Sequence, residues 1–524
     1  MATLKVLILA AKPVGHGQIF TGELESPLLI PFQGKPLVMH FENQFKDFDI
    51  FYALGGGTFK TQSFIGKRFR ESSFITVPEE VLIGTPGDCL LHCLEQLNFP
   101  DNILTIHGDN IYEFKDYPTL MDKNINYFYE TESRDGKYEY YPTIGERNDD
   151  SKTRSKKSTN WVNTGAHFIK VSGSIDRTKG VLINDLLRDA DFIGLNKWID
   201  LGHWDLINRN NTLISSRHFN TISLSRDRSS IIKLSTKNKI QREFEHLSNV
   251  PPEFSFLFPR VEILSEIKGY KIEYWPLRPL SEYLVFWNLD LLSWAKIFEK
   301  ILCYIDRFAS HTFEIVGLEP NLENIYVKML DERIQQYSKE CLDILNYNFV
   351  FLNGFKLKGF AEYSEVLYQD LRRIGNSINP SFYHGDLCLS NILFHPESEI
   401  IKLIDPKGSL FPESSNAGDF RYDLAKLFHS IIGEYDYFNS TMFSLLQIEN
   451  YFTIDLFKQS NSNVLETKFR EVMLRFHSKE ILRDVEILMA MLFLTMVPLH
   501  CDSRERQKAL LIQGIKILNH IYLN

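Results

Sequence analysis

The chain has 524 residues, which is more than one hydrophobic core usually organises, so we expect about two to four domains. Apolar residues make up 44% of the chain and charged residues 24%, which is the composition of an ordinary globular protein. The net charge of -9 argues against a protein that binds nucleic acid through a broad basic face.

The first segment, Met1–Leu9, is typical of a β-strand. Its apolar stretch is too short for a signal peptide and no small-residue cleavage site follows, so we expect a cytoplasmic protein. The apolar run Ile487–Val497 is about half as long as a membrane span, so it predicts a buried helix and no membrane-spanning segment. The six cysteines form no C-x-x-C pair, which favours reduced thiols over a disulfide frame or a zinc site. They are Cys89, Cys93, Cys303, Cys341, Cys388 and Cys501.

Residues 1 to about 200 alternate short apolar segments with helical ones. This pattern predicts an α/β domain with a mostly parallel sheet that is covered on both faces. The expected strands are Lys5–Ala10, Ile50–Leu54, Phe74–Val77, Asn102–His107 and Ala166–Val171. The charged segment Asp149–Ser158 could bind phosphates, but a solvated loop is the more ordinary interpretation.

Glycine and acidic motifs follow several of these strands. In chain order they are Gly15-His16-Gly17, Gly84-Thr85-Pro86-Gly87, Ile106-His107-Gly108-Asp109, Asn163-Thr164-Gly165 and Trp198-Ile199-Asp200-Leu201-Gly202. Together with the segment 27–37 they resemble the motifs of the sugar-nucleotide and phosphocholine nucleotidyltransferases. The resemblance covers about residues 1–205 and implies a Rossmann-like, GT-A-like nucleotidyltransferase fold.

The resemblance also implies roles for these residues. Two carboxylates, Asp109 and Asp200, would hold Mg²⁺ against the α-phosphate of a nucleoside triphosphate. Backbone amides of the Gly15–Gly17 turn would cradle the triphosphate. The other implied nucleotide- or acceptor-binding residues are Lys35, Gly84, Thr85, Gly87, Asn163 and Gly165.

The opening loop departs from the family pattern. Lys12-Pro13-Val14 is inserted before Gly15, no arginine follows Gly17, and Ser26-Pro27 stands where the family has a proline-lysine pair. The missing cations normally neutralise the triphosphate and the leaving pyrophosphate. Lys12 or Lys35 could replace them, although Lys35 also fits a simple turn. A first domain that only binds or senses a nucleotide therefore remains an alternative.

From about residue 210 the pattern changes. The strand-like segments His218–Leu224, Ser230–Leu234, Val261–Ile267 and Tyr270–Tyr274 come first. Long amphipathic helices then run from about residue 290 to the end, interrupted once, at 382–405. This order predicts a small β-rich lobe at 206–280 and a helical lobe at 281–524, after a first domain at 1–205, and it is a kinase-like plan.

The residues needed for phosphoryl transfer follow in a plausible order. Asp386 would accept the proton of the acceptor hydroxyl, while Asn391 and Asp405 would hold Mg²⁺. Lys233 would reach the α- and β-phosphates, and Glu243 in the next helix would fix that lysine. Taken singly, Lys233 is more often a solvated edge residue and Glu243 a surface residue. Acidic groups bounded by apolar strands are costly unless they bind something.

These motifs resemble the aminoglycoside phosphotransferase and choline kinase superfamily. The strings are His384-Gly385-Asp386-Leu387-Cys388-Leu389-Ser390-Asn391, Ile404-Asp405-Pro406-Lys407-Gly408 and Arg421-Tyr422-Asp423-Leu424-Ala425-Lys426-Leu427. The resemblance covers about residues 215–524 and implies a two-lobed, α+β protein-kinase-like fold. Glu273 and Trp275 would lie at the hinge, where they either read the adenine or pack the strand. Phe219–Arg226 contains no glycine where a phosphate-covering loop belongs.

Three hypotheses follow. The first is a bifunctional, Mg²⁺-dependent enzyme that phosphorylates a small hydroxylated metabolite with ATP and couples the phosphate to a nucleotide from CTP or UTP. The resemblance implies that such activated compounds decorate capsule or lipopolysaccharide. The second keeps only the kinase, and the third is a non-enzymatic scaffold. Choline, ethanolamine, an amino-sugar, a heptose and a glycerol-like alcohol all remain open as acceptors, and the oligomeric state is not predicted.

Overall fold

The structure is a computed structural model. It describes residues 4–11, 24–69, 72–100, 102–114, 127–132, 161–170, 191–201, 220–225, 227, 229–235, 239–264, 269–287, 289–315, 322–411, 414, 416–459 and 461–523. The chain divides into two compact units, and among the described residues the first extends to Leu201 and the second begins at Asn220. Each unit is described by itself below.

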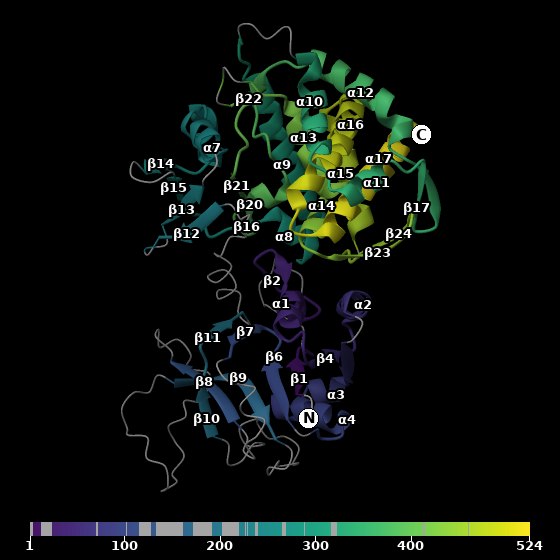
Figure 1. Cartoon of the computed structure of the whole chain (residues 1–524). Coiled ribbons are helices and arrows are strands. Elements are labelled where there is room, and N and C mark those ends of the chain that lie inside the picture. Colours follow the sequence, from purple (N-terminus) through teal and green to yellow (C-terminus); the bar gives the residue numbers. More distant parts are fainter. Residues whose placement is uncertain are drawn as a thin grey trace. The chain divides into compact units, whose positions relative to one another are not determined.

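A seven-stranded sheet forms the centre of the first unit, in the order β10-β8-β9-β6-β1-β4-β5 (Figure 1). Strand β1 pairs in parallel with β4 and β6, β4 with β5, and β8 with β10, whereas β9 is antiparallel to both of its neighbours. The predicted mostly parallel sheet is thus confirmed. The strands are β1 (Lys5–Leu9), β4 (Asp49–Gly55), β5 (Ser73–Val77), β6 (Ile103–His107), β8 (Tyr127–Glu132), β9 (Trp161–Ile169) and β10 (Asp191–Gly194).

Apolar side chains of helix α4 (Pro86–Gln96) pack on this sheet. Leu90 and Leu94 join Leu7, Ala53 and Ile169 in one buried cluster. Removing each large aliphatic side chain from water stabilises the unit by about 1.5–3 kcal/mol. The remaining elements of the unit are β2 (Pro31–Phe32), β3 (Lys35–Pro36), α1 (Leu37–Gln44), α2 (Phe59–Arg68), α3 (Glu79–Leu82), β7 (Asn110–Glu113) and β11 (Lys197–Asp200).

The second unit begins with a four-stranded antiparallel sheet in the order β12-β13-β15-β14. Its strands are β12 (Asn220–Leu224), β13 (Ser230–Ser235), β14 (Val261–Leu264) and β15 (Gly269–Glu273), and helix α7 (Lys239–Ser248) contacts β14 and β15. All four strands were predicted. The last part of the predicted strand 261–267 lies outside the described residues.

Helices dominate the rest of the second unit (Figure 1). Ile487–Met496 of α16 is buried throughout, which confirms the prediction of a core helix in this apolar run. Within the described part of the chain, every helix is too short or too polar to cross a membrane. The helices are α8 (Leu280–Val285), α9 (Leu291–Ser310), α10 (Ile325–Ile334), α11 (Lys339–Leu345), α12 (Ala361–Asn376), α13 (Phe420–Ile431), α14 (Tyr435–Asn439), α15 (Ser462–Phe476), α16 (Lys479–Met496) and α17 (Arg504–Leu523).

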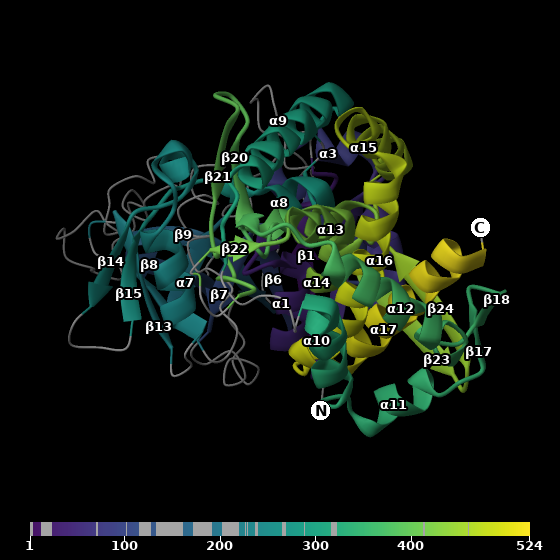
Figure 2. The ribbon, with the colours of Figure 1, turned by 90° about the horizontal axis from the view of Figure 1, so that it is seen from above.

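The prediction that these helices are interrupted once is wrong. A second four-stranded sheet, β18-β17-β24-β23, lies at one side of the helices (Figure 2). Between β17 and β18 the chain reverses at Asn353-Gly354, whose φ values of 50° and 85° are those of a tight hairpin turn. The strands are β17 (Phe349–Leu352), β18 (Phe355–Lys358), β23 (Phe443–Ile448) and β24 (Tyr451–Leu456).

The predicted interruption at 382–405 is present. Strands β20 (Ile392–His395) and β21 (Ile400–Leu403) form a hairpin, and β16 (Arg278–Pro279) pairs with the free side of β20. Separately, β19 (Ser381–Phe382) pairs with β22 (Ala417–Gly418). The loop that joins β19 to β20 carries His384–Asn391.

Candidate active site

The loop after β19 turns sharply at Gly385, where φ is +79°. A Cβ atom at this position would lie 2.9 Å from the ring of Tyr383 and 3.0 Å from Cβ of Lys407. Both the backbone conformation and the space therefore require glycine.

His384 fixes the loop through both of its ring nitrogens. Nε2 lies 3.0 Å from the carbonyl oxygen of Ile404, and the backbone N–H of Asp386 donates to Nδ1 at 3.2 Å. A carbonyl only accepts, so the proton must sit on Nε2. Burial lowers the pKa of His384 to about 4, which agrees with this neutral ring.

Asp423 holds the same loop from helix α13. Its two carboxylate oxygens accept the backbone N–H groups of His384 and Gly385, each at 2.7 Å. Burial raises the pKa of Asp423 to about 7, and the two amide hydrogen bonds act against that rise. The carboxylate thus positions the backbone that presents Asp386.

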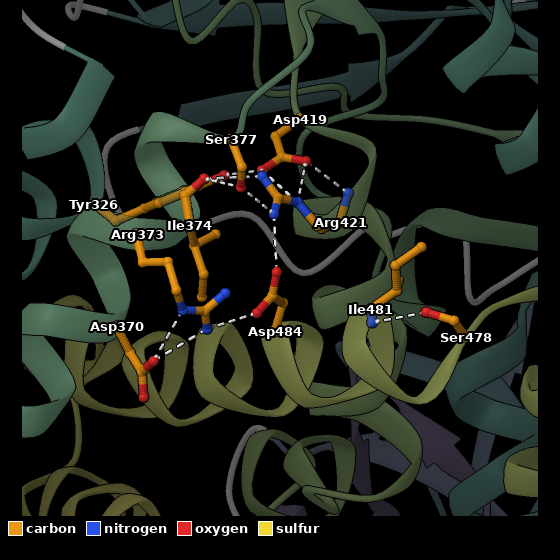
Figure 3. A network of polar contacts seen from close by, with 10 residues as sticks. All are labelled: Tyr326, Asp370, Arg373, Ile374, Ser377, Asp419, Arg421, Ser478, Ile481 and Asp484. Atoms are coloured by element: carbon orange, nitrogen blue, oxygen red, sulfur yellow. Dashed lines mark hydrogen bonds and ion pairs between the residues drawn. The ribbon is translucent and has the colours of Figure 1, made fainter.

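A buried polar network anchors the start of α13 (Figure 3). Asp419 caps the helix by accepting the N–H of Arg421 at 3.0 Å, and Tyr326 donates to the other carboxylate oxygen at 2.8 Å. The guanidinium of Arg421 pairs with Asp419 and with Asp484 of α16, each at 2.9 Å. Arg373 of α12 also pairs with Asp484, at 2.8 Å. The network thereby ties together four helices, α10, α12, α13 and α16.

Asp386 has a lysine beside it. Nζ of Lys426, also on α13, lies 2.9 Å from its Oδ1. The side chain of Lys426 is 7% exposed and that of Asp386 is 27% exposed. Burial opposes the charge of Lys426, but Asp386 outweighs it and the pKa of Lys426 is raised. The carboxylate is therefore the more accessible partner of this ion pair.

Asn391 and Asp405 are neighbours at the β20–β21 hairpin. The N–H of Ile404 donates to the carbonyl oxygen of Asn391 at 3.0 Å, which places Asp405 next to it. Asn391 uses Nδ2 to donate to the carbonyl oxygen of Asp386 at 2.8 Å, so its Oδ1 faces away from that bond. Asp405 has a φ of +57°, a conformation that residues other than glycine adopt at a cost, often at functional sites.

Lys233 reaches this hairpin from β13. Its Nζ lies 2.5 Å from Glu243 on α7 and 3.0 Å from Oδ1 of Asp405. Burial opposes its charge, but Asp405 and Glu243 outweigh burial and raise the pKa of Lys233. Burial and the Asp405 carboxylate raise the pKa of Glu243 to about 7, and the Tyr270 hydroxyl donates to the same carboxylate.

Glu273 and Trp275 lie at the end of the four-stranded sheet. The carboxylate of Glu273 accepts the N–H of Arg260 at 3.3 Å, and Nζ of Lys402 lies 4.6 Å from the centre of the Trp275 ring. Both side chains are only partly buried. These contacts fit the packing interpretation of the segment, and a role in binding adenine stays a prediction.

The donor set of the second unit suits Mg²⁺. The ion prefers oxygen ligands and is usually held by one or two carboxylates together with substrate phosphates. Asp405 supplies a carboxylate that is 45% exposed. Asn391, whose backbone carbonyl oxygen accepts the N–H of Ile404, supplies an amide oxygen. Across the ranges that the structure describes, no group of three or more His, Cys, Asp or Glu side chains could hold a metal by itself. A site completed by nucleotide phosphates fits that arrangement.

Two acidic residues are also neighbours along the backbone of the first unit. Asp200 of β11 is opposite Asn110 of β7, and the N–H of Leu201 donates to the carbonyl oxygen of Asp109 at 2.9 Å. Nδ2 of Asn110 contacts Oδ1 of Asp109 at 2.5 Å, and Trp198 donates to Oδ1 of Asn110 at 3.0 Å. The oxygen ligands again suit Mg²⁺.

Two glycines bring β1, β6 and β9 close to these carboxylates. A Cβ atom on Gly108 would lie 2.7 Å from Cβ of Ala10, just after β1. Gly165 of β9 has a φ of +77°, and a Cβ atom there would lie 3.2 Å from the ring of His107. The structure thus brings Asp109, Asp200 and Gly165 to the carboxyl ends of β1 and β6, the edge at which open α/β sheets bind ligands. Asn163 lies on the same strand as Gly165, opposite Glu130.

The remaining predicted residues of the first unit are less informative. Thr85 caps α4, and its Oγ1 accepts the N–H of Asp88 at 3.2 Å. A Cβ atom on Gly84 would lie 2.7 Å from Oδ2 of Asp88, and Gly87 is buried in the first turn of α4. Lys35 is exposed beside the Gln33-Gly34 turn of the β2–β3 hairpin. Lys12, Gly15 and Gly17 lie outside the described residues.

Sequence reasoning did not assign roles to Asp423 and Lys426. Both belong to the motif 421–427, which had been noted only as a resemblance. The sequence did contain a signal. Asp423 and Lys426 are three residues apart, so they lie on one face of the helix. Charged side chains within a mostly apolar helix are costly to bury unless each has a partner.

Comparisons with known proteins add little to this geometry. No protein-family model and no curated relative matches the chain. A solved chain from Bacillus anthracis, described as a glucose-1-phosphate thymidylyltransferase in complex with a sucrose, is 19% identical with a TM-score of 0.33. The match covers 42% of this chain and 98% of that one. A match with so low a TM-score and identity does not assign a function to this chain, so the functional proposal depends on the geometry described above.

Proposed function

We propose that the second unit is a small-molecule kinase that uses ATP and Mg²⁺. The observation that carries the proposal is the contact of Lys233 with both Glu243 and Asp405. Lys233 and Asp405 are 172 residues apart in the chain, yet Nζ of Lys233 lies 3.0 Å from Oδ1 of Asp405. In protein kinases a lysine paired with a glutamate binds the nucleotide phosphates and a nearby aspartate holds Mg²⁺, and Lys233, Glu243 and Asp405 are positioned for these tasks.

Each residue then has one task. The acceptor hydroxyl oxygen attacks the γ-phosphorus of ATP while its proton passes to Asp386, and the bond from the γ-phosphorus to the bridging oxygen breaks, so that ADP leaves with the electron pair. Lys233 binds the α- and β-phosphates, and Glu243 keeps it in place. Asn391 and Asp405 would hold Mg²⁺, which when bound offsets the charge of the phosphate oxygens.

The test uses the full chain and a panel of hydroxylated metabolites, namely amino-alcohols, sugars and glycerol-like alcohols. ADP formation that depends on an acceptor is expected for the wild type, with a loss of at least about 1000-fold in Asp386→Asn, because the base is removed. Glu471→Gln is the matched control, since Glu471 is an exposed helix residue paired with Lys468 at 3.2 Å. Equal turnover in Asp386→Asn and the wild type would refute the assignment of the base.

We further propose that the first unit is a nucleotidyltransferase that couples the phosphorylated product to a nucleotide. A phosphate oxygen of that product would attack the α-phosphorus of CTP or UTP, and the bond to the β-phosphate would break to release pyrophosphate. The two carboxylates Asp109 and Asp200 at the carboxyl ends of β1 and β6 support this proposal. The product would be an activated precursor for capsule or lipopolysaccharide decoration, made in the cytoplasm.

One observation favours a second candidate, in which the first unit binds a nucleotide without catalysis. Ser26 and Pro27 stand where the related enzymes have a proline-lysine pair, and both are buried at the start of a short 3-10 turn. Oγ of Ser26 donates to the carbonyl oxygen of Ala10 at 3.3 Å. No cation can therefore come from these two positions.

Pyrophosphate release separates the two candidates. The wild type receives ATP, an acceptor that the second unit phosphorylates, and CTP or UTP in turn. A catalytic first unit predicts pyrophosphate that Asp109→Asn abolishes while ADP formation persists. Absence of pyrophosphate with every nucleotide, under conditions in which ADP still forms, would establish the second candidate.

A further inference from the structure

The catalytic loop carries no cation of its own. The four residues between Asp386 and Asn391 are Leu387, Cys388, Leu389 and Ser390. Burial raises the pKa of the Cys388 thiol to about 12, so this residue is neutral as well. Charge that develops on a transferred phosphoryl group must then be met from another element of the fold.

Lys426 is the cation that the fold places there. It comes from α13, whose first turn is fixed by Asp419 and Arg421 and whose Asp423 holds the loop backbone. Its Nζ lies 2.9 Å from Oδ1 of Asp386. In the proposed reaction Asp386 takes the proton of the acceptor hydroxyl, so this ammonium lies directly beside the group at which the reacting atoms meet, which are about 3–3.5 Å apart in a productive complex.

The ammonium of Lys426 also has unused donors. An ammonium group has three N–H bonds, whereas the described residues give Nζ a single hydrogen-bonding partner, Asp386. The ring of Tyr422, with its centre 5.9 Å from Nζ, adds only a weak cation–π contact. Lys407 also lies near this ring and donates to the Tyr422 hydroxyl oxygen at 3.0 Å.

We infer that Lys426 is the residue that stabilises the transferred phosphoryl group, which it reaches from α13 and not from the catalytic loop. This inference rests on the proposed kinase function of the second unit. The ion pair with Asp386 then has two uses: it turns one carboxylate oxygen toward α13, and it holds the ammonium beside the reacting oxygen.

The experiment compares the transition state with the ground state, and it needs no identified acceptor. Melting temperatures of the full chain are measured with Mg²⁺ and ADP, and then with Mg²⁺, ADP and aluminium fluoride, which mimics the phosphoryl group in transfer. The wild type is expected to gain a further rise with aluminium fluoride, because enzymes bind transition-state mimics more tightly than products. Lys426→Gln is expected to keep the rise with ADP and to lose the further one.

Turnover gives the second readout. ADP formation in Lys426→Gln is expected to fall by about 100- to 1000-fold, the usual loss when one preorganised donor is removed, while KM for ATP changes by less than about threefold. Lys426→Arg, which keeps the charge, is expected to recover turnover to within about tenfold of the wild type. Lys468→Gln on α15 is the control for loss of an exposed lysine.

A stability defect is separated by a second pair of variants. Removing Lys426 alone takes the ion-pair partner away from the Asp386 carboxylate, which destabilises the chain. The double variant Asp386→Asn with Lys426→Met removes both charges of the ion pair, whereas Asp386→Asn alone keeps the buried Lys426 ammonium. The aluminium fluoride rise is compared between these two after both are shown to be folded by circular dichroism. If the double variant keeps the rise in melting temperature with aluminium fluoride, the inference is overturned. Turnover of Lys426→Gln within threefold of the wild type would also overturn it. A wild type that responds to neither ADP nor ATP would instead overturn the proposed kinase function itself.

Discussion

Replacing Asp423 tests how the catalytic loop is held. Its carboxylate accepts two backbone N–H groups at 2.7 Å in a fully buried position. Hydrogen bonds to a charged group contribute about 1.5–3 kcal/mol each, and a buried donor left without a partner costs about 1–3 kcal/mol. Asp423→Ala is therefore expected to lower the free energy of unfolding by about 3–5 kcal/mol.

Asp423→Asn should be milder, because the amide keeps one acceptor oxygen but turns an NH₂ group toward the second N–H. We expect a loss of about 2 kcal/mol, with turnover reduced more strongly than KM for ATP, since the loop that carries Asp386 is displaced while Lys233 is not.

The assay is urea unfolding followed by circular dichroism, together with ADP formation, and Glu471→Gln again serves as the control. A loss of less than about 1 kcal/mol in Asp423→Ala, with turnover unchanged, would contradict this reasoning. It would mean that the loop is held by His384 and its own turn.

Three further predictions address other parts of the molecule. Glu243→Gln should raise KM for ATP by about tenfold or more, because Lys233 would then be held by Asp405 alone; an unchanged KM would contradict its positioning role. Burial raises the pKa of Asp436 from 3.8 to about 7. The folded state therefore binds this proton more tightly than the unfolded state, so stability is present below about pH 4 and is lost as the pH rises through about 7. The loss is expected to reach roughly 4 kcal/mol, and Asp436→Asn should flatten the profile measured by urea unfolding at pH 5 and pH 8. Gly354→Ala should cost about 1 kcal/mol from backbone strain alone, since φ is +85° and no atom lies within 4 Å of the added Cβ; a neutral result would show that the turn relaxes.

The sequence predicted regular elements where one period dominated. Short apolar segments, several of them continuously apolar, predicted β1, β4, β5 and β6, and strand-like segments predicted β12, β13, β14 and β15, because such patterns follow from backbone geometry. The sheet formed by β17, β18, β23 and β24 was missed although Asn353-Gly354 is a strong hairpin signal. Its strands are short, and the long helices on either side dominated the pattern.

The sequence predicted the candidate residues and the pairing of Lys233 with Glu243, but not the other contacts of the site. Position and spacing suggested Lys233, Glu243 and Asp405, but only the folded chain brings residues 172 positions apart within 3.0 Å. The ion pair between Lys426 and Asp386 could not be read from spacing, since it depends on how α13 packs beneath the loop. Such contacts arise from tertiary packing, whereas the periodic patterns of a single sequence report only local secondary structure.

Phosphate transfer from ATP tests the central claim most directly. The full chain is incubated with γ-labelled ATP, Mg²⁺ and the acceptor panel, and labelled products are separated by mass. The account predicts one or more phosphorylated hydroxyl compounds with the wild type and none with Asp386→Asn. A wild type that binds Mg²⁺ and ATP but labels none of the acceptors, or an Asp386→Asn variant that labels them equally well, would contradict it.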